Sequence, residues 1–319
     1  MEQLSSTWMW IVFSIFLVIA LSIDTFVLDK YRSRSANTWR AALFWTIVWI
    51  TLALIFNVLL WFYYYHHVSP EFAHTQALLF FTAYIIEKSL SLDNLFVFYL
   101  VFQHFRIPIK YQHRVLAYGI WGAVLMRLGI ILVGVWLVTK FHWLIYVMGA
   151  FLFFTGIKII VTSEKEKDLS ETIIIRLAKK IFRVTHEFHD ESFFIRKNNL
   201  LFATPLFIAL IMIEFSDLVF AVDSIPAVFA ITRDPFIVWT SNIFAILGLR
   251  AMYFLLAKAV DSLFLLKYGI ALILVYVGAK MMLEPWYKIP ASASLCVIAL
   301  IILVFSCISV YVSSRQERL

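Results

Sequence analysis

Six carboxylates occur inside strongly apolar stretches of the sequence, where charged side chains are unusual. A charge in the middle of a membrane costs about 2.5–3.5 kcal/mol on insertion scales, so such acids face a polar interior and mark ion or proton pathways. Where several acids surround one site, some can bind a metal ion while others carry protons. The six acids are Asp24, Glu87, Asp93, Glu214, Asp217 and Asp223.

The side chains near these acids offer only oxygen as a metal ligand. Ser91 and Asn94 flank one of the acids, Asn242 occurs further along the chain, and no cysteine or histidine lies close in the sequence. Hard divalent cations such as Mn²⁺, Mg²⁺ and Ca²⁺ prefer oxygen ligands, whereas zinc and copper favour imidazole or thiolate. The residues alone therefore predict a hard-cation site and leave Mn²⁺ and Ca²⁺ as alternatives. The predicted ligands are Glu87, Asp93, Asn94, Glu214, Asp217 and Asp223.

Helical spacing constrains how these acids can converge. Glu214 and Asp217 are three residues apart and share a helix face. Asp223 follows Asp217 by six residues, which is about 240° around an ideal helix, so a straight helix would not direct both acids at one ion. Pro226 removes the backbone bond to the carbonyl of Val222. We expect the helix to kink or unwind there and to swing Asp223 inward.

Basic side chains lie in the same apolar stretches. Arg127 and Arg250 are expected to pair with the carboxylates and to hold the two related halves of the chain together rather than to contact the cation. Lys88 is expected to pair either with a neighbouring residue or with Asp24. We therefore assign supporting roles to Asp24, Lys88, Ser91, Arg127, Asn242 and Arg250.

The elements that must position these residues are membrane helices. Of the 319 residues, 63% are hydrophobic and 15% are charged, and the mean hydropathy is +0.89. Soluble domains are about 45–50% apolar and about 25% charged. Because a segment in lipid must satisfy its own backbone hydrogen bonds, we predict an all-α polytopic membrane protein. Its nine candidate spans are residues 8–28, 41–62, 77–103, 115–138, 142–162, 200–231, 236–257, 263–283 and 291–312.

The distribution of Lys and Arg predicts the orientation of these spans. Nineteen lie on one side of the predicted membrane, and only Lys140, Arg233 and Lys288 lie on the other. The richer side is cytoplasmic by the positive-inside rule, which places the N-terminus outside and the C-terminus in the cytoplasm and requires an odd number of spans. This pattern also accounts for the net charge of +7, so we expect a lipid bilayer and not nucleic acid as the partner. The sequence indicates no particular oligomeric state.

An internal repeat relates two three-helix segments. Each has a first helix with two acids six residues apart, a second helix with Arg127 or Arg250, and a third helix in which a tyrosine precedes a Gly-x-Lys lysine by twelve residues. Because three is odd, the copies must insert with opposite orientations, as in secondary transporters with a binding site at the repeat interface. The predicted organisation is an N-terminal two-helix segment at 1–70, a first repeat at 71–162, a cytoplasmic loop at 163–199, a second repeat at 200–284 and a C-terminal helix at 285–319.

The segments around the acids resemble the TerC family of integral membrane proteins. The similarity rests on EKSLSLDN at 87–94, EFSDLVFAVDSIPA at 214–227, TSNIFAILGLRAMYF at 240–254 and RKN at 196–198, and it extends over about residues 8–312. It implies a fold shared with the lysine-exporter-like superfamily. It also implies export of Mn²⁺ across the bacterial inner membrane, with the acids of the third and sixth helices as ligands.

We therefore expect a secondary transporter rather than an enzyme. Mn²⁺ would be the transported substrate, protons are the candidate coupling ion, and no permanently bound cofactor is expected. The resemblance also links such proteins to tellurite resistance, alkaline pH, calcium and membrane-protein assembly. A Ca²⁺/H⁺ exchanger and a non-transport scaffold in a stress response are thus the alternatives.

Overall fold

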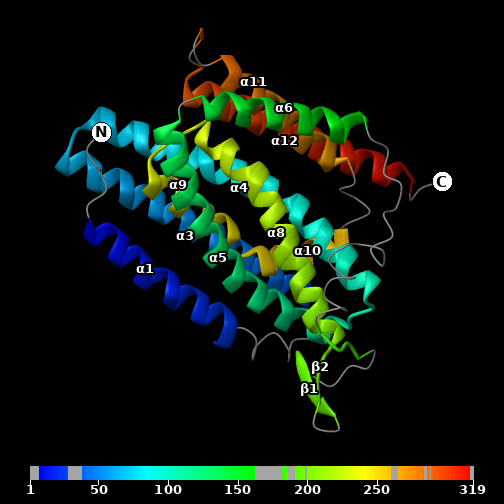
Figure 1. Ribbon diagram of the computed structural model, residues 1–319. Helices are drawn as coiled ribbons and strands as arrows, with labels where there is room; N and C mark the ends of the chain where they lie inside the picture. Colours follow the sequence, from blue (N-terminus) through cyan, green and yellow to red (C-terminus); the bar gives the residue numbers. More distant parts are fainter. Residues whose placement is uncertain are drawn as a thin grey trace.

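In the computed structural model, long α-helices make up most of the described chain (Figure 1). The structure describes residues 7–27, 38–141, 143–161, 182–185, 191–197, 200–259, 265–283, 286–287 and 289–316. The elements in chain order are α1 (Thr7–Ser22), the π-helical turn η1 (Ile23–Val27), α3 (Thr38–His67), α4 (Pro70–His104), α5 (Ile109–Lys140), α6 (Leu144–Val161), β1 (Phe194–Lys197), β2 (Leu200–Ala203), α8 (Pro205–Phe229), α9 (Pro235–Ile246), α10 (Leu249–Ala259), α11 (Leu266–Leu283) and α12 (Ala291–Gln316).

The helices coincide with the predicted apolar runs. Each run contains at least one described helix, and α9 and α10 together occupy the run at 236–257. Five described helices, or six if α9 and α10 form one bent span, are long and apolar enough to cross a membrane. The described chain is therefore an all-α polytopic membrane protein apart from one short hairpin. Nine membrane crossings stay a prediction.

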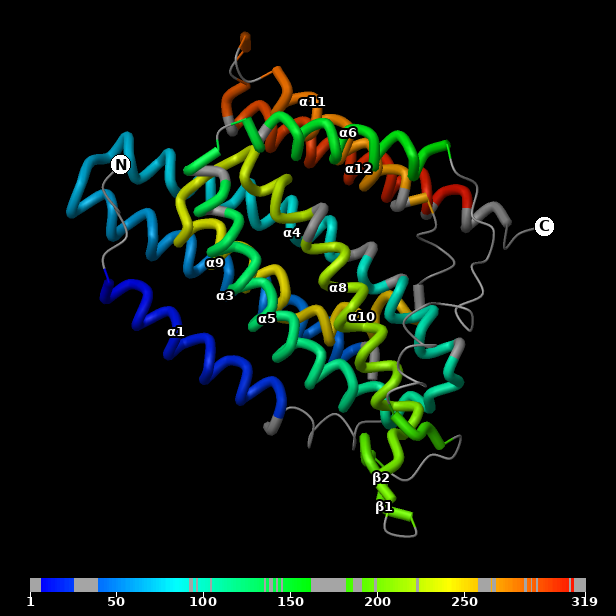
Figure 2. Tube along the Cα trace, in the orientation of Figure 1, coloured from blue at the N-terminus to red at the C-terminus, as the bar shows by residue number. Residues whose placement is uncertain are grey.

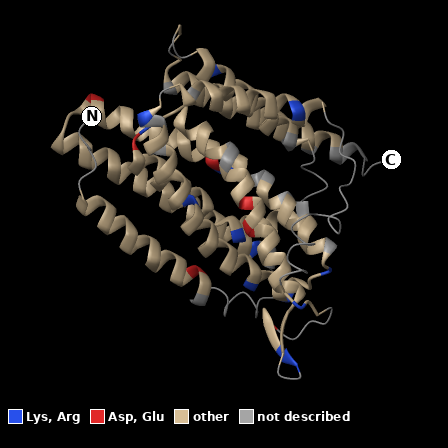
Figure 3. Ribbon diagram, in the orientation of Figure 1, with Lys and Arg blue, Asp and Glu red and all other residues tan. Residues whose placement is uncertain are grey.

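The outer helices expose large apolar side chains. Ile11 and Ile15 of α1, Phe44 and Val58 of α3, and Leu303 of α12 are all more than half exposed. In water, an apolar surface of this extent would favour aggregation, but in a bilayer it is the surface that contacts lipid. Figure 3 shows that Lys, Arg, Asp and Glu are sparse along these helices, as a lipid-facing surface requires.

Two outer groups of helices flank a central group (Figures 1 and 2). α6, α11 and α12 lie together on one side of the molecule, and α1 and α3 lie on the opposite side. Between them, α4 packs on α8 and α9, and α5 packs on the same two helices. These four helices come from distant parts of the chain and enclose the polar interior.

α6 and α11 approach each other at glycines. A Cβ on Gly156 would lie 2.6 Å from the carbonyl oxygen of Ala271, and a Cβ on Gly278 would lie 2.6 Å from the carbonyl oxygen of Gly149. Gly156, near the end of α6, meets Ala271 near the start of α11, whereas Gly149, near the start of α6, meets Gly278 near the end of α11. The two helices therefore run antiparallel. Their backbones are in direct contact, which only glycine permits at these positions.

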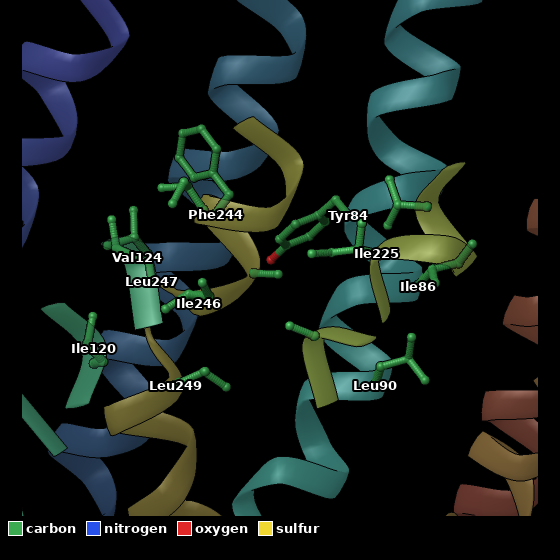
Figure 4. Close-up of a cluster of buried hydrophobic side chains, with 14 of the residues drawn as sticks. Tyr84, Ile86, Leu90, Ile120, Val124, Ile225, Phe244, Ile246, Leu247 and Leu249 are labelled. Atoms are coloured by element: carbon green, nitrogen blue, oxygen red, sulfur yellow. The ribbon is translucent and has the colours of Figure 1, made fainter. Parts of the chain in front are cut away.

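α9 and α10 meet at a bend of 41°. Gly248 at the bend has a φ of +85°, a conformation that glycine adopts without steric cost. Figure 4 shows buried apolar side chains around the bend, among them Leu247 and Leu249 together with Ile120 of α5 and Leu90 of α4. The one strongly bent helix pair among the described helices therefore carries Asn242 and Arg250 of the sequence motifs, not the acids.

The predicted unwinding at Pro226 is wrong. α8 continues as a helix through Pro226 to Phe229. Pro226 lies in the last turn, where its ring removes a single hydrogen bond, and the next turn is closed by the bond from Ala230 N to Pro226 O of 3.1 Å. A proline so close to a helix end interrupts too few bonds to break the helix.

A hairpin precedes α8. β1 pairs antiparallel with β2, with Phe194 opposite Ala203 and Lys197 opposite Leu200. The segment expected as a cytoplasmic loop at 163–199 therefore ends in the first strand of a small sheet. Most of that segment lies outside the described residues.

Candidate cation site

Arg127 of α5 lies at the centre of the polar interior and is 1% exposed. Its Nη1 donates to Glu87 Oε2 of α4 at 3.0 Å. Its Nε and Nη2 donate to Asp217 Oδ2 and Oδ1 of α8 at 3.1 and 2.8 Å. The two parallel bonds to Asp217 match the planar fork of the guanidinium to the carboxylate. Arg127 thus joins one acid from each predicted repeat.

Two amides complete the hydrogen bonds of these carboxylates. Asn242 of α9 donates to Glu87 Oε1 at 2.7 Å and accepts from Arg127 Nη1 at 3.2 Å. Asn94 of α4 donates to Asp217 Oδ1 at 3.3 Å. All four carboxylate oxygens therefore accept at least one hydrogen bond. With both acids ionised, the five-residue network carries a formal charge of −1.

A small cavity adjoins the network. It offers about 30 Å³ to the centres of water-sized molecules, about twice what one buried water needs. Ser91 and Ser224 are buried at its wall, and their hydroxyl oxygens have no hydrogen-bond partner among the described residues. The lining residues are Glu87, Leu90, Ser91, Asn94, Arg127, Ile159, Phe220, Ser224, Ile270 and Leu274.

Helical periodicity explains the polar wall of this cavity. Glu87, Ser91 and Asn94 are spaced by four and three residues on α4, which places them on one face. On α8, Asp217 and Ser224 are seven residues apart and share a face for the same reason. Ser224 is a site residue that the sequence reasoning missed, although it follows Asp223 as Asn94 follows Asp93.

Asp93 and Asp223 lie in the described helical backbone of α4 and α8, but their side chains lie outside the described part of the structure. Their predicted role as ligands therefore stays a prediction. Among the described side chains, no group of three or more His, Cys, Asp or Glu could hold a metal ion.

Glu214 lies apart from the Arg127 network. Its carboxylate packs against α5 at Gly122, where a Cβ would overlap it, and its Oε2 has no hydrogen-bond partner among the described residues. The side chain is half-buried. The shared face of Glu214 and Asp217 thus directs both acids toward α5, but only Asp217 reaches Arg127.

A second charged contact joins η1, which directly follows α1, to α10. Asp24 in η1 is buried, and its Oδ2 lies 3.8 Å from Nε of Arg250. The neighbouring Thr25 accepts a hydrogen bond from Trp121 Nε1 at 3.1 Å. Arg250 therefore contacts a carboxylate, as expected, but one outside the two repeats.

Lys88 stabilises the bend between α9 and α10. Its ammonium group donates to the carbonyls of Ala245 at 3.1 Å and Leu247 at 3.3 Å. The interrupted helix leaves these carbonyls without their usual partners. Of the two alternatives predicted for Lys88, the pairing with Asp24 is therefore not the one that these bonds form.

The comparisons with known proteins bear on this geometry. The profile described as "Integral membrane protein TerC family" matches residues 72–317. The chain belongs to the TerC family. The match begins in the first turn of α4 and contains the Arg127 network, the cavity and α12, whereas α1 and α3 precede it.

Three relatives illustrate how far this TerC protein resembles others. It is 46% identical to "Putative membrane-bound redox modulator Alx" of Salmonella typhi, over 100% of this chain and 98% of the relative. It is 44% identical to the protein of the same name in Escherichia coli K12, over 100% and 99% of the two chains. It is 44% identical to "Uncharacterized membrane protein STKORF319" of Myxococcus xanthus, over 93% and 90%. No solved structure is significantly similar.

Proposed function

We propose that this TerC protein is a secondary transporter that exports Mn²⁺ across the bacterial inner membrane in exchange for protons. The observation that carries the proposal is the buried network of two carboxylates and two amides around Arg127, beside a water-sized cavity in a helical membrane protein. Buried charges in a membrane are costly and mark ion pathways. A protein that served only as a scaffold would gain nothing from them.

The donor chemistry favours a hard cation. Apart from the guanidinium of Arg127, the polar groups at the cavity are carboxylate, amide and hydroxyl groups, and such oxygen ligands suit Mn²⁺, Mg²⁺ and Ca²⁺. The proposed ligand set joins Glu87, Asn94 and Asp217 with Asp93 and Asp223 on the same two helices. Glu214 is a candidate proton carrier in this scheme, since its carboxylate lies outside the network.

The packing of α6 on α11 supports the inverted repeat. Gly156 meets Ala271 and Val275, and Gly278 meets Gly149 and Phe153. Gly156 and Gly278 are 122 positions apart in the sequence, and so are their contacts: Ala271 corresponds to Gly149, and Val275 to Phe153. The same offset separates Lys158 from Lys280. Such reciprocal contacts between antiparallel helices are what a local two-fold axis produces. Inverted repeats related by an axis in the membrane plane are typical of secondary transporters.

Metal content of manganese-sensitive cells tests the proposal. Expression of the wild-type protein should lower cell manganese and restore growth, and Asp223→Ala and Asp93→Ala should abolish both effects at equal membrane abundance. Glu191→Gln is the matched control, because Glu191 is an exposed carboxylate that pairs with Arg114 at the protein surface. Failure of the wild-type protein to lower cell manganese would exclude Mn²⁺ export.

Membrane vesicles separate the remaining alternatives. Mn²⁺ flux that follows an imposed pH gradient supports exchange for protons, and flux that ignores the gradient excludes it. Ca²⁺ flux in place of Mn²⁺ flux would identify a Ca²⁺/H⁺ exchanger. Flux of neither ion would favour the scaffold role.

The name of the relatives raises a redox role. Cys296 and Cys307, the two cysteines of this chain, lie eleven residues apart on α12. Eleven residues of helix span about 16 Å, too far for a disulfide within one chain. We therefore expect the double variant Cys296→Ser/Cys307→Ser to transport Mn²⁺ as the wild type does, and loss of transport would instead favour a thiol-dependent role.

A further inference from the structure

Arg127 occupies the hydrogen-bonding oxygens that a bound cation would need. Each oxygen of Asp217 accepts from the guanidinium, and Glu87 Oε2 accepts from it as well. The guanidinium group and a divalent cation are both attracted by the negative charge of these carboxylate oxygens. A divalent cation bound to these same oxygens would repel the guanidinium and compete with it for them.

The adjoining cavity places an incoming cation next to Arg127. Glu87, Asn94 and Arg127 of the network line the cavity directly. The hydroxyl oxygens of Ser91 and Ser224, which are 1% and 4% exposed, have no partner there among the described residues. A cation in this cavity would therefore meet the two serine hydroxyls, which have no partner among the described residues, and the carboxylate of Glu87, which is paired with Arg127.

We propose that Arg127 is a tethered counter-cation, which holds Glu87 and Asp217 in the empty protein and is displaced from at least one of them when the transported cation binds. This inference rests on the proposed function, because it assigns a role within the same site. Arg127 would keep its bond to Asn242 Oδ1, which is a neutral acceptor. The empty site then never contains two unpaired buried carboxylates, a state that would be strongly destabilised.

Displacement has a measurable consequence for binding. The cation must compete with the guanidinium, so its apparent affinity in the wild-type protein is lower than the ligands alone would allow. Replacing Arg127 by a neutral residue removes the competitor. Purely structural pairing that persists in the bound state makes the opposite prediction, because loss of Arg127 would then disorder the ligands and weaken binding.

Equilibrium binding of Mn²⁺ to the purified full-length protein in detergent tests the inference. We expect Arg127→Gln to bind Mn²⁺ about tenfold more tightly or better, which corresponds to about 1.4 kcal/mol. The same variant should melt at a lower temperature than wild type without Mn²⁺ and gain more thermal stability from it, because binding stabilises the folded state. Equal or weaker binding by the variant would overturn the inference.

Two further variants keep the test decisive. Arg127→Lys retains the charge but cannot form the forked bonds to Asp217, so it should also bind Mn²⁺ more tightly than wild type, and it decides the question if Arg127→Gln does not fold. Lys88→Gln is the matched control, since Lys88 is a partly buried cation next to Glu87 that donates to carbonyls instead. Tightening by Lys88→Gln equal to that by Arg127→Gln would indicate general electrostatics and overturn displacement.

Failure of the inference and failure of the proposed function give different results. If the wild-type protein transports and binds Mn²⁺ but neither Arg127 variant binds more tightly, the tethered counter-cation is wrong and the transporter stands. If the wild-type protein and the variants bind neither Mn²⁺ nor Ca²⁺, both proposals are wrong.

Discussion

At the scale of single residues, two acids one helical turn apart on α8 have different surroundings. Asp217 is buried and accepts hydrogen bonds from Arg127 and Asn94. Glu214 is half-buried against Gly122, and its Oε2 has no hydrogen-bond partner within the described part of the chain. Neutralising Asp217 therefore leaves Arg127 with one buried carboxylate instead of two, whereas neutralising Glu214 removes the partner of no cation among the described side chains.

We expect Asp217→Asn to lower the free energy of unfolding by about 3 kcal/mol, at the lower end of the loss when one partner of a buried ion pair is removed. Glu214→Gln should change it by less than about 1 kcal/mol. Thermal denaturation in one detergent checks both variants. If both variants lost the same free energy of unfolding, the hydrogen bonds of Asp217 would not determine how much it stabilises the protein. That result would also contradict the placement of Glu214 outside the Arg127 network.

The residue types of the site could be predicted from the sequence, but their pairing could not. Buried charge in apolar stretches is visible in composition, and periodicity places Glu87, Ser91 and Asn94 on one face. Which acid reaches Arg127 depends on the rotation and spacing of four separate helices. The contact between Asp24 and Arg250 was likewise hidden, because it joins segments more than 200 residues apart.

At the scale of elements, the bend between α9 and α10 depends on one glycine. Gly248 has a φ of +85°, and a Cβ there would lie 2.8 Å from the ring of Trp49. We expect Gly248→Ala to lower the free energy of unfolding by about 1–3 kcal/mol, because the left-handed conformation alone costs about 1–2 kcal/mol for a residue with a Cβ. The melting temperature of the purified protein in detergent measures the loss.

Gly129→Ala is the control for this variant. Gly129 is exposed on α5, and a Cβ there would meet nothing within 4 Å. Alanine in a helix interior should be neutral or stabilise the protein by about 0.5–1 kcal/mol relative to glycine. A tolerated Gly248→Ala would show that the bend does not require the left-handed backbone.

The elements themselves could be predicted well, and the break between them could not. Apolar runs fix where helices form, since a backbone in lipid must bond within its own segment. We predicted a broken helix at Pro226, but this proline lies in the last turn of α8 and removes only one backbone hydrogen bond. Gly248 carries the actual bend, and a lone glycine between leucines gives little signal, because its backbone conformation is set by the packing of Trp49 and by Lys88.

At the scale of the whole molecule, the orientation of the two halves decides whether the protein can alternate between two sides of a membrane. The distribution of Lys and Arg predicts opposite orientations, and the reciprocal glycine contacts of α6 and α11 agree with a two-fold relation. α1 and α3 precede the family match, and the Asp24–Arg250 contact attaches the first of them to the second half. Direct measurement of sidedness can separate inverted from parallel halves.

Single cysteines placed at exposed positions provide that measurement. In a background of Cys296→Ser and Cys307→Ser, an impermeant thiol reagent added to intact spheroplasts should label Glu71→Cys, at the start of the first repeat, and Arg233→Cys, after α8. It should label Lys110→Cys and Arg196→Cys only in inverted vesicles, because these positions lie on the side richer in Lys and Arg. All four native residues are exposed. Glu71 lies in the first turn of α4, and Arg196 lies in the hairpin before α8, the equivalent helix. Parallel halves would instead place Glu71→Cys and Arg196→Cys on the same side. Labelling of both Glu71→Cys and Arg196→Cys from outside would therefore exclude the inverted repeat. It would also exclude a transport cycle in which the two inverted halves exchange their conformations.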